Sequence, residues 1–343
     1  MKRIHMFTAT VAACLMLFFS CNDIVDHPTN PDLAEVVPTS CTIPPLRKWL
    51  NDEYLSWGKV PTLITASPEL SMSDLANFHT LYFENSPENQ YYGVNGEYTD
   101  QINQSFKDVK SFWDIEAENI MTVAAHGSML QDRNKVVKMY TKIYGYSNEK
   151  ANKYADSLAT LFKIYPQFLK GEHPAFTFNQ IAVPDTTFPN IGQIPAKIVI
   201  GDGLLQGLDE IGYAKIAPQA ILAHEFGHHI QYDLGILKRG VKLTPKTSRR
   251  FELMADAYAA YFLAHNKGAA MQLNDLQQVA EVLFNTGDCN FTVDGHHGTP
   301  TQRKAATEWG YNLARNADKK DHIIGSREFA GLFDADLNDL VKK

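Results

Sequence analysis

One short motif constrains this chain more than any other: His224 and Glu225 are followed, after two residues, by His228. On an α-helix, the two histidines lie one turn apart on the same face. Two imidazoles at that spacing can hold one metal ion, and Glu225 beside them can reach a water molecule at the metal. The alternative is an ordinary amphipathic helix with two satisfied histidines, and the sequence further along the chain favours the metal site.

The residues around the motif predict that it lies on a helix. Pro218 suits the first helical turn, where its missing N–H costs nothing, and Gly235 suits the C-terminal end. The face opposite the histidines carries an apolar stripe that would anchor the helix in a core. The stripe consists of Leu222, Phe226, Ile230 and Leu234.

A second predicted helix supplies a third ligand. Ser248 can cap the N-terminus of a helix that runs to about His265. Glu252 lies on this helix, far enough after His228 for a loop and a returning helix to bring its carboxylate to the metal. Two histidines and one glutamate leave one coordination position open for water, which is the arrangement of a catalytic zinc ion, Zn²⁺.

The same helix carries Asp256, one turn beyond Glu252. We expect Asp256 to accept a hydrogen bond from a ligand imidazole and so to fix its tautomer, with a solvent-facing acid as the alternative. Ala255, Ala259 and Ala260 would let this helix pack closely against the first.

Three blocks of the sequence resemble the bacterial neutral zinc metallopeptidases, a zincin-type family whose third ligand is a glutamate. The blocks are His224–Gln231, Glu252–Asp256, and Gly298-Thr299 with Gln302-Arg303, and the resemblance covers roughly residues 175–315. It implies an α+β zincin-like metallopeptidase domain, predominantly helical, with a small sheet beside the metal helix. It also implies zinc on His224, His228 and Glu252, with Glu225 catalytic.

The third block contains a further catalytic candidate. A peptidase needs a hydrogen-bond donor near the developing oxyanion, and His297 is one candidate, with Tyr258 and Tyr261 as rivals. The alternative for this block is that Gln302 and Arg303 fix the start of a helix and that His297 is structural.

The N-terminus has the features of a bacterial lipoprotein signal peptide. In residues 1–20, Lys2 and Arg3 precede an apolar run that is too short to span a bilayer as a permanent helix. Cys21 follows as the expected lipidated residue of the mature protein, which would hold the protein on a membrane of the cell envelope. A plain secretory signal is the alternative.

Residues 21–45 predict a flexible tether because prolines recur there among polar residues. Without the signal peptide, which carries two basic residues and no acidic one, the formal net charge changes from −7 to −9. A chain this acidic, without a large basic patch, argues against nucleic acid as a partner.

Two cysteines, Cys41 and Cys289, remain after the signal peptide and Cys21 are set aside. Outside the cytoplasm they could form a disulfide between the N-terminal segment and the domain. Sequence alone does not bring them within bonding distance, so a free Cys41 is the alternative.

We expect residues 46–343 to form one catalytic domain, with a mainly helical part at 46–170 and the metal-site part at 171–343. Apolar residues recur at helical spacing within 106–165, where His126 and Trp113 are either structural or line a cleft. Phe176 and Phe178 alternate with polar residues, and residues 197–203 resemble a strand ending in a turn. That strand is either an ordinary sheet strand or an edge on which an extended peptide could lie.

The function that the sequence favours is a zinc-dependent peptidase acting on peptide or protein substrates, with Glu225 as general base. One alternative is a non-enzymatic surface lipoprotein that binds a peptide or protein partner. Another is a metal-dependent amidase that acts on cell-wall material.

Overall fold

The structure is a computed structural model that describes residues 33–342. The expected signal peptide and Cys21 lie outside these residues. The described chain combines many helices with a small sheet, which confirms the α+β class and the predominance of helix. The helices are α1 Pro45–Ser56, α2 Lys59–Thr65, α3 Met72–Phe83, α4 Thr99–Phe112, α5 Arg133–Lys142, α6 Asn148–Ile164, α7 Asp202–Glu210, α8 Ala217–Asp233, α9 Pro245–Ala264, α10 Leu273–Thr286, α11 Pro300–Asp318 and α12 Ser326–Leu340.

The strands form a three-stranded sheet and a separate hairpin. In the larger sheet, β5 is central and pairs in parallel with β1 and antiparallel with β2. The strands are β1 Met121–Ala125, β2 Gln180–Val183, β3 Thr186–Phe188, β4 Gly192–Ile194 and β5 Lys197–Gly201, and β3 pairs with β4.

Strand β5 confirms the strand expected at 197–203, with one difference. It ends at Gly201 and runs directly into α7, so no turn follows it. Both of its edges are paired, and β5 is therefore an ordinary sheet strand that cannot receive a peptide. Within the described residues, strand β2 has an unpaired edge and lies beside α8.

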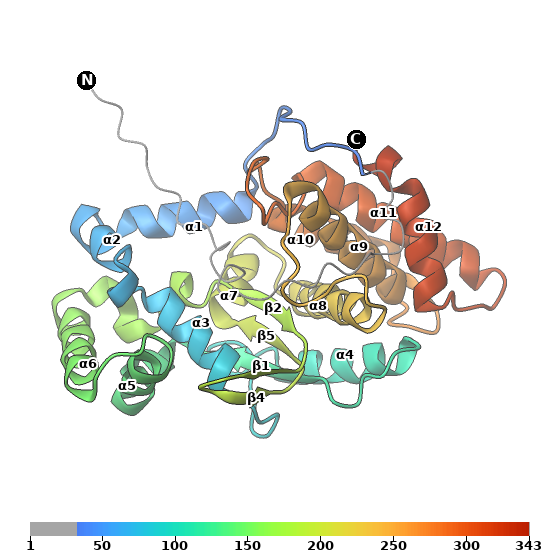
Figure 1. Cartoon of the computed structure of the whole chain (residues 1–343). Helices are drawn as coiled ribbons and strands as arrows, with labels where there is room; N and C mark the ends of the chain where they lie inside the picture. Colours follow the sequence, from blue (N-terminus) through green and yellow to red (C-terminus); the bar gives the residue numbers. More distant parts are fainter. Residues whose placement is uncertain (1–32, 343) are drawn as a thin grey trace.

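Helices cover both faces of the sheet (Figure 1). Ile198 and Ile200 belong to the same core as the apolar side of α8, whereas Val199 points to the other face. Lys197 lies two residues before Val199 and therefore points to the same face of the sheet. Its buried ammonium donates to the carbonyls of Leu81 and Glu84 at the end of α3. Helices α8 and α3 therefore lie on opposite faces of β5.

The helix that carries the motif has the expected bounds. Pro218 lies in the first turn of α8, and Gly235 follows its end with a positive φ of 69°. Leu222, Phe226 and Ile230 are fully buried in the larger core, which confirms the apolar stripe.

The second predicted helix begins one turn earlier than expected. Helix α9 starts at Pro245, because Thr244 and Thr247 form a reciprocal capping box. Ser248 is a buried residue inside the helix rather than its cap, so that prediction is wrong. The helix ends beside His265, as expected.

Small residues bring the core helices close together. A Cβ atom added to Gly227 of α8 would lie 2.9 Å from the Cα of Ala255 in α9. A Cβ added to Gly310 of α11 would lie 2.3 Å from the carbonyl oxygen of Ala257. Helix α9 is thus held tightly between α8 and α11, which fixes the positions of the side chains that they share.

Two stretches that precede α8 differ from expectation. Residues 106–165 contain α5 and α6 as predicted, but also β1, whose short apolar run has no helical period. Phe176 ends a short 3₁₀ turn, Pro174–Phe176, instead of lying in a strand.

The described part of the expected tether lies on the domain. Residues 33–44 form no helix or strand. The backbone of Ala34 accepts a hydrogen bond from Arg249 of α9 and donates one to Asn338 of α12. Cys41 and Cys289 form a disulfide with their Cα atoms 5.7 Å apart, so the alternative of a free Cys41 is wrong. This segment is therefore fixed to the domain from Leu33 onward.

No helix within residues 33–342 combines the length and the apolar character needed to cross a membrane.

Candidate metal centre

Three side chains from two helices meet at the predicted site. The Nε2 atom of His224 lies 3.4 Å from Oε2 of Glu252, and the Nε2 atom of His228 lies 3.5 Å from Oε1 of Glu252. Ligand atoms about 2.0–2.2 Å from a tetrahedral zinc ion lie roughly 3.3–3.6 Å from one another. The donor set and its spacing therefore fit a zinc ion.

Glu225 lies beside this cluster. Its carboxylate and one ring nitrogen from each of His224 and His228 lie within 4.8 Å of one another. Glu225 approaches His224 only to 3.9 Å, whereas Glu252 comes closer and lies between both imidazoles. Glu252 is consequently the better third ligand, and Glu225 is free to act as an acid or base.

The environment of Glu225 suits a general base. Burial raises the pKa of its carboxyl to about 7, although the positive charge on His224 and a backbone hydrogen bond from Ala182 oppose the shift. A base with a pKa near neutrality both takes up and releases a proton readily. Ala182 belongs to β2, so the edge strand lies against the Glu225 side of the cluster.

Asp256 occupies the position that the sequence predicts. Its Oδ1 atom lies 2.9 Å from Nδ1 of His224, so this hydrogen bond directs Nε2 of the imidazole toward the ligand cluster. Burial alone would lower the pKa of His224, but the hydrogen bonds with Asp256 and Glu252 raise it to about 9. The solvent-facing alternative is excluded, because Asp256 is fully buried.

His228 has a different partner. Its Nδ1 lies 3.1 Å from Oε1 of Gln231, and Gln231 in turn donates to the carbonyl of Phe251 at 2.7 Å. Burial lowers the pKa of His228 to about 4, which leaves its imidazole neutral and ready to bind a cation. No role was predicted for Gln231, although its position three residues after His228, on the same helical face, was a sequence signal that could have indicated one.

Arg303 joins the cluster from α11. Its guanidinium donates two hydrogen bonds to Asp256 and one to Glu252, at 3.1 Å. Gln302 does cap the start of α11, through a capping box with Thr299. Arg303, by contrast, fixes the carboxylates of Asp256 and Glu252, so the alternative in which it fixes the start of a helix is wrong for this residue.

His297 lies close enough to the cluster for its charge to lower the pKa of Glu252. Its side chain is 41% exposed. Asp288 accepts hydrogen bonds from the backbone N–H of His297 at 2.7 Å and pairs with its Nδ1 at 3.1 Å. The pairing with Asp288 engages Nδ1, so any further hydrogen bond of the ring involves Nε2. His296, which is fully buried, pairs with the other oxygen of Asp288.

The tyrosine rivals of His297 lie elsewhere. The hydroxyl of Tyr258 donates to the carbonyl of Ser326, and the hydroxyl of Tyr261 accepts from the N–H of Ile324. A different tyrosine is near the site: the charges of Glu225 and Glu252 add to burial in raising the pKa of Tyr232. Tyr232 lies one turn after His228, a signal that sequence reasoning overlooked.

The other aromatic candidates are structural. Nδ1 of His126 pairs with Asp202 at 2.7 Å, and its ring stacks on Tyr91. Trp113 is buried against Tyr258 and Phe329. Neither residue belongs to the candidate metal cluster.

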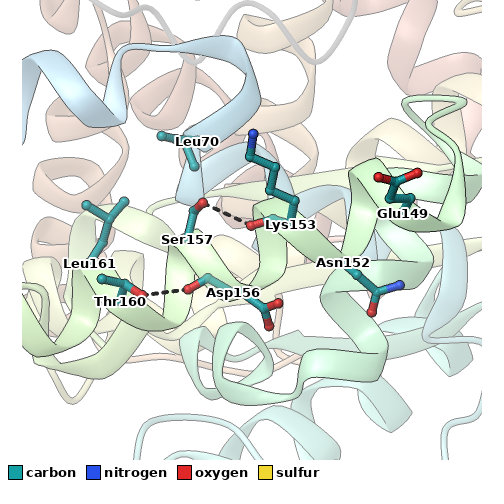
Figure 2. A pocket seen from close by; sticks show the side chains of 8 residues that line it. All are labelled: Leu70, Glu149, Asn152, Lys153, Asp156, Ser157, Thr160 and Leu161. Atoms are coloured by element: carbon teal, nitrogen blue, oxygen red, sulfur yellow. Dashed lines mark hydrogen bonds between the residues drawn. The ribbon is translucent and has the colours of Figure 1, made fainter.

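A depression on the surface of α6 offers no comparable chemistry (Figure 2). The hydroxyls of Ser157 and Thr160 donate to carbonyls of their own helix. Its lining residues are Leu70, Glu149, Asn152, Lys153, Asp156, Ser157, Thr160 and Leu161. None of them belongs to the cluster at α8 and α9.

The chain matches no known protein family model, no curated protein and no solved structure.

Proposed function

We propose that this protein is a zinc-dependent peptidase with His224, His228 and Glu252 as the zinc ligands. The observation that carries the proposal is the approach of the Glu252 carboxylate to both imidazole Nε2 atoms, at 3.4 and 3.5 Å. These separations agree with a tetrahedral zinc site that has three protein ligands and one open position. Zinc held there would supply a Lewis acid and lower the pKa of water in the open position.

Each remaining residue has a defined role in hydrolysis. Glu225 takes the proton from the attacking water and passes it to the leaving amine. His297, held by Asp288, donates a hydrogen bond to the oxygen of the scissile carbonyl as negative charge develops there. Asp256 and Gln231 keep the Nδ1 atoms of the two ligand histidines engaged.

The edge strand supports a peptide as the substrate. Within the described residues β2 pairs only with β5, and the N–H of Ala182 points to Glu225. An extended peptide added along this edge would form main-chain hydrogen bonds and bring one of its amide bonds to Glu225. Such binding tolerates varied side chains, which suits a peptidase.

We also propose that the protein is attached to a membrane of the cell envelope by lipid on Cys21. The support is the signal-like sequence that precedes this cysteine. Replacing Cys21 by serine should abolish incorporation of radiolabelled fatty acid in a bacterial host and release the protein from membranes. Unchanged labelling in this variant would contradict the assignment.

The test of the proposed activity measures zinc and hydrolysis in the same preparations. Elemental analysis of residues 22–343 should find about one zinc per chain. His228→Ala should retain little zinc. His126→Asn, which changes a histidine outside the cluster, should retain all of it.

The second part of the test uses Glu225→Gln. This variant should keep its zinc but hydrolyse unfolded casein about 10²–10⁴-fold more slowly, since general base catalysis is lost. Undiminished turnover in Glu225→Gln would contradict the proposal. So would absence of zinc from the wild type after purification without chelators and addition of the metal.

A further inference from the structure

We propose that one end of the domain is a membrane-binding surface that inserts apolar side chains into an anionic phospholipid bilayer. The surface consists of exposed side chains on α1, α2, α6 and the short 3₁₀ segment η4 (Pro166–Gly171). We call it the α2–η4 surface. Its apolar members are Leu55, Val60, Leu63, Ile164 and Leu169.

The exposure of these five residues is the first observation. Among the residues that the structure describes, eleven large hydrophobic side chains are exposed, and five of them belong to the α2–η4 surface. Each of the five is between 54% and 62% exposed. Single exposed apolar residues are normal in soluble proteins, but a local concentration of them indicates a binding surface.

The segments that carry these side chains are neighbours in space. The ring of Trp57, at the end of α1, lies 5.3 Å from that of Phe168 in η4, and Gln167 donates to the carbonyl of Trp57. Leu70, which follows α2, lines the same depression as Leu161 of α6 (Figure 2). Helices α2 and α6 accordingly lie at the same end of the molecule (Figure 1).

The backbone at η4 is held in an unusual conformation that keeps one of these side chains outward. Leu169 and Lys170 have φ values of 48° and 55°, a left-handed region that non-glycine residues seldom adopt. Gly171 follows, and a Cβ on it would come within 2.9 Å of the carbonyl oxygen of Gly127. The turn is thus fixed by close packing on its inner side, which maintains a strained conformation that exposes Leu169.

Charge points to an anionic membrane as the partner. Lys59, Lys163 and Lys170 are exposed directly beside Val60, Ile164 and Leu169. The exposed acids in or next to these segments are Asp52, Glu149, Asp156 and Glu172, and none of them is adjacent in sequence to any of the five apolar residues. Apolar side chains with flanking lysines suit the interface of a bilayer that contains anionic lipids. A second copy of the chain fits less well, because it would bring two sets of lysines together.

The proposed lipid attachment gives this surface access to a bilayer. Leu33, where contacts with the domain begin, lies twelve positions after Cys21. An extended chain of that length spans at most about 40 Å. The tether joins the domain at α9 and α12, at the other end from α2 and α6 (Figure 1), so the α2–η4 surface reaches the membrane when the tethered domain turns toward it.

The test measures binding of residues 22–343, without lipid, to sedimented vesicles. One set of vesicles is pure phosphatidylcholine, and the other contains equal parts of phosphatidylcholine and phosphatidylglycerol. Wild type should sediment with the anionic vesicles, and Leu63→Glu with Leu169→Glu should reduce the partition coefficient about tenfold or more. Lys59→Gln with Lys170→Gln should weaken binding to the anionic vesicles alone.

The matched control is Leu273→Glu, which changes an exposed leucine at the start of α10. This variant should bind vesicles as the wild type does. The single variant Leu63→Glu replaces the double one if the latter loses its zinc or its far-ultraviolet circular dichroism. Failure of wild type to bind anionic vesicles, or equal binding by wild type and the glutamate variants, would overturn the proposal. Both results are independent of peptidase activity.

Discussion

Arg303 and Asp256 form a buried, two-bond ion pair behind the candidate metal cluster. Nε of Arg303 donates to Oδ2 of Asp256 at 2.6 Å, and Nη2 donates to Oδ1 at 2.7 Å. Asp256 is fully buried, and the Arg303 side chain is 1% exposed. Because Oδ1 also pairs with His224, this arginine fixes the carboxylate that orients a proposed zinc ligand.

Replacing Arg303 by methionine should therefore destabilise the protein strongly. The change leaves the Asp256 carboxylate buried without its charged partner, which we expect to cost about 3–5 kcal/mol of unfolding free energy. Arg303→Lys should rescue only part of the loss, since lysine lacks the planar fork that forms two parallel bonds.

Urea denaturation of the zinc-free proteins measures the loss of stability in both variants. Arg133→Met, which breaks an exposed ion pair, is the control and should change stability little. Equal stabilities for all variants would contradict the argument.

Zinc affinity should increase with pH up to about pH 9. The paired carboxylates raise the pKa of His224 to about 9, so at neutral pH the zinc-free site holds a proton that zinc must displace. His228, with its pKa lowered to about 4, holds none. The apparent affinity should then rise about tenfold per pH unit below pH 9.

Competition with a chelator of known pH dependence measures this change in zinc affinity. Asp256→Asn removes a group that raises this pKa, so the slope should end at a lower pH. A flat profile in the wild type would exclude the mechanism.

The local sequence was sufficient to predict that the side chains of His224, His228 and Glu252 meet at one site. Helical spacing places His224 and His228 on one face, and one loop with a returning helix brings Glu252 to them. The bounds of α8 followed from Pro218 and Gly235, whose effects on the backbone are local. Of the two helices that carry these residues, α9 begins earlier than predicted. Thr244, like Ser248, can cap a helix, and its capping box with Thr247 is the stronger signal.

The residues that support the ligands were harder to predict. Arg303 lies 47 positions after Asp256, and only the packing of α11 on α9 brings them together. Asp288 precedes His297 by nine positions in a segment without helix or strand, so no periodicity relates them. Strand β1 was missed because its partner β5 is more than seventy residues away. Tertiary pairings of this kind leave no local pattern.

The carboxyl of Asp288 should make the free energy of unfolding depend on pH in the acid range. Burial raises the pKa of its carboxyl, but the hydrogen bonds and positive charges of His296 and His297 outweigh this and lower the pKa well below its usual value. A carboxyl whose pKa is lowered in the folded state stabilises the protein fully above its unfolded pKa of about 3.9. That stabilisation is lost as the pH falls below this value. Asp288→Asn should therefore be less stable than wild type at neutral pH, and the difference should shrink in acid. Urea denaturation at a series of pH values measures it, and a difference that stays constant down to pH 2 would be evidence against this role.

The disulfide between Cys41 and Cys289 should stabilise both the domain and the segment that carries His297. Cys289 directly follows Asp288, the residue that holds His297, and Cys41 belongs to the segment that lies along α9. The bond closes a loop with a sequence separation of 248, and we expect Cys41→Ser with Cys289→Ser to lower the free energy of unfolding by roughly 2–4 kcal/mol.

Zinc content should not change, because the ligands are held by α8, α9 and Arg303 rather than by this segment. The rate of hydrolysis should fall, since a looser segment positions His297 less well. Parallel measurements of zinc, turnover and urea denaturation separate these effects. Loss of zinc together with turnover would mean that the disulfide supports the ligand helices themselves, whereas unchanged turnover and stability would mean that contacts such as the one between Arg249 and Ala34 hold the segment without it.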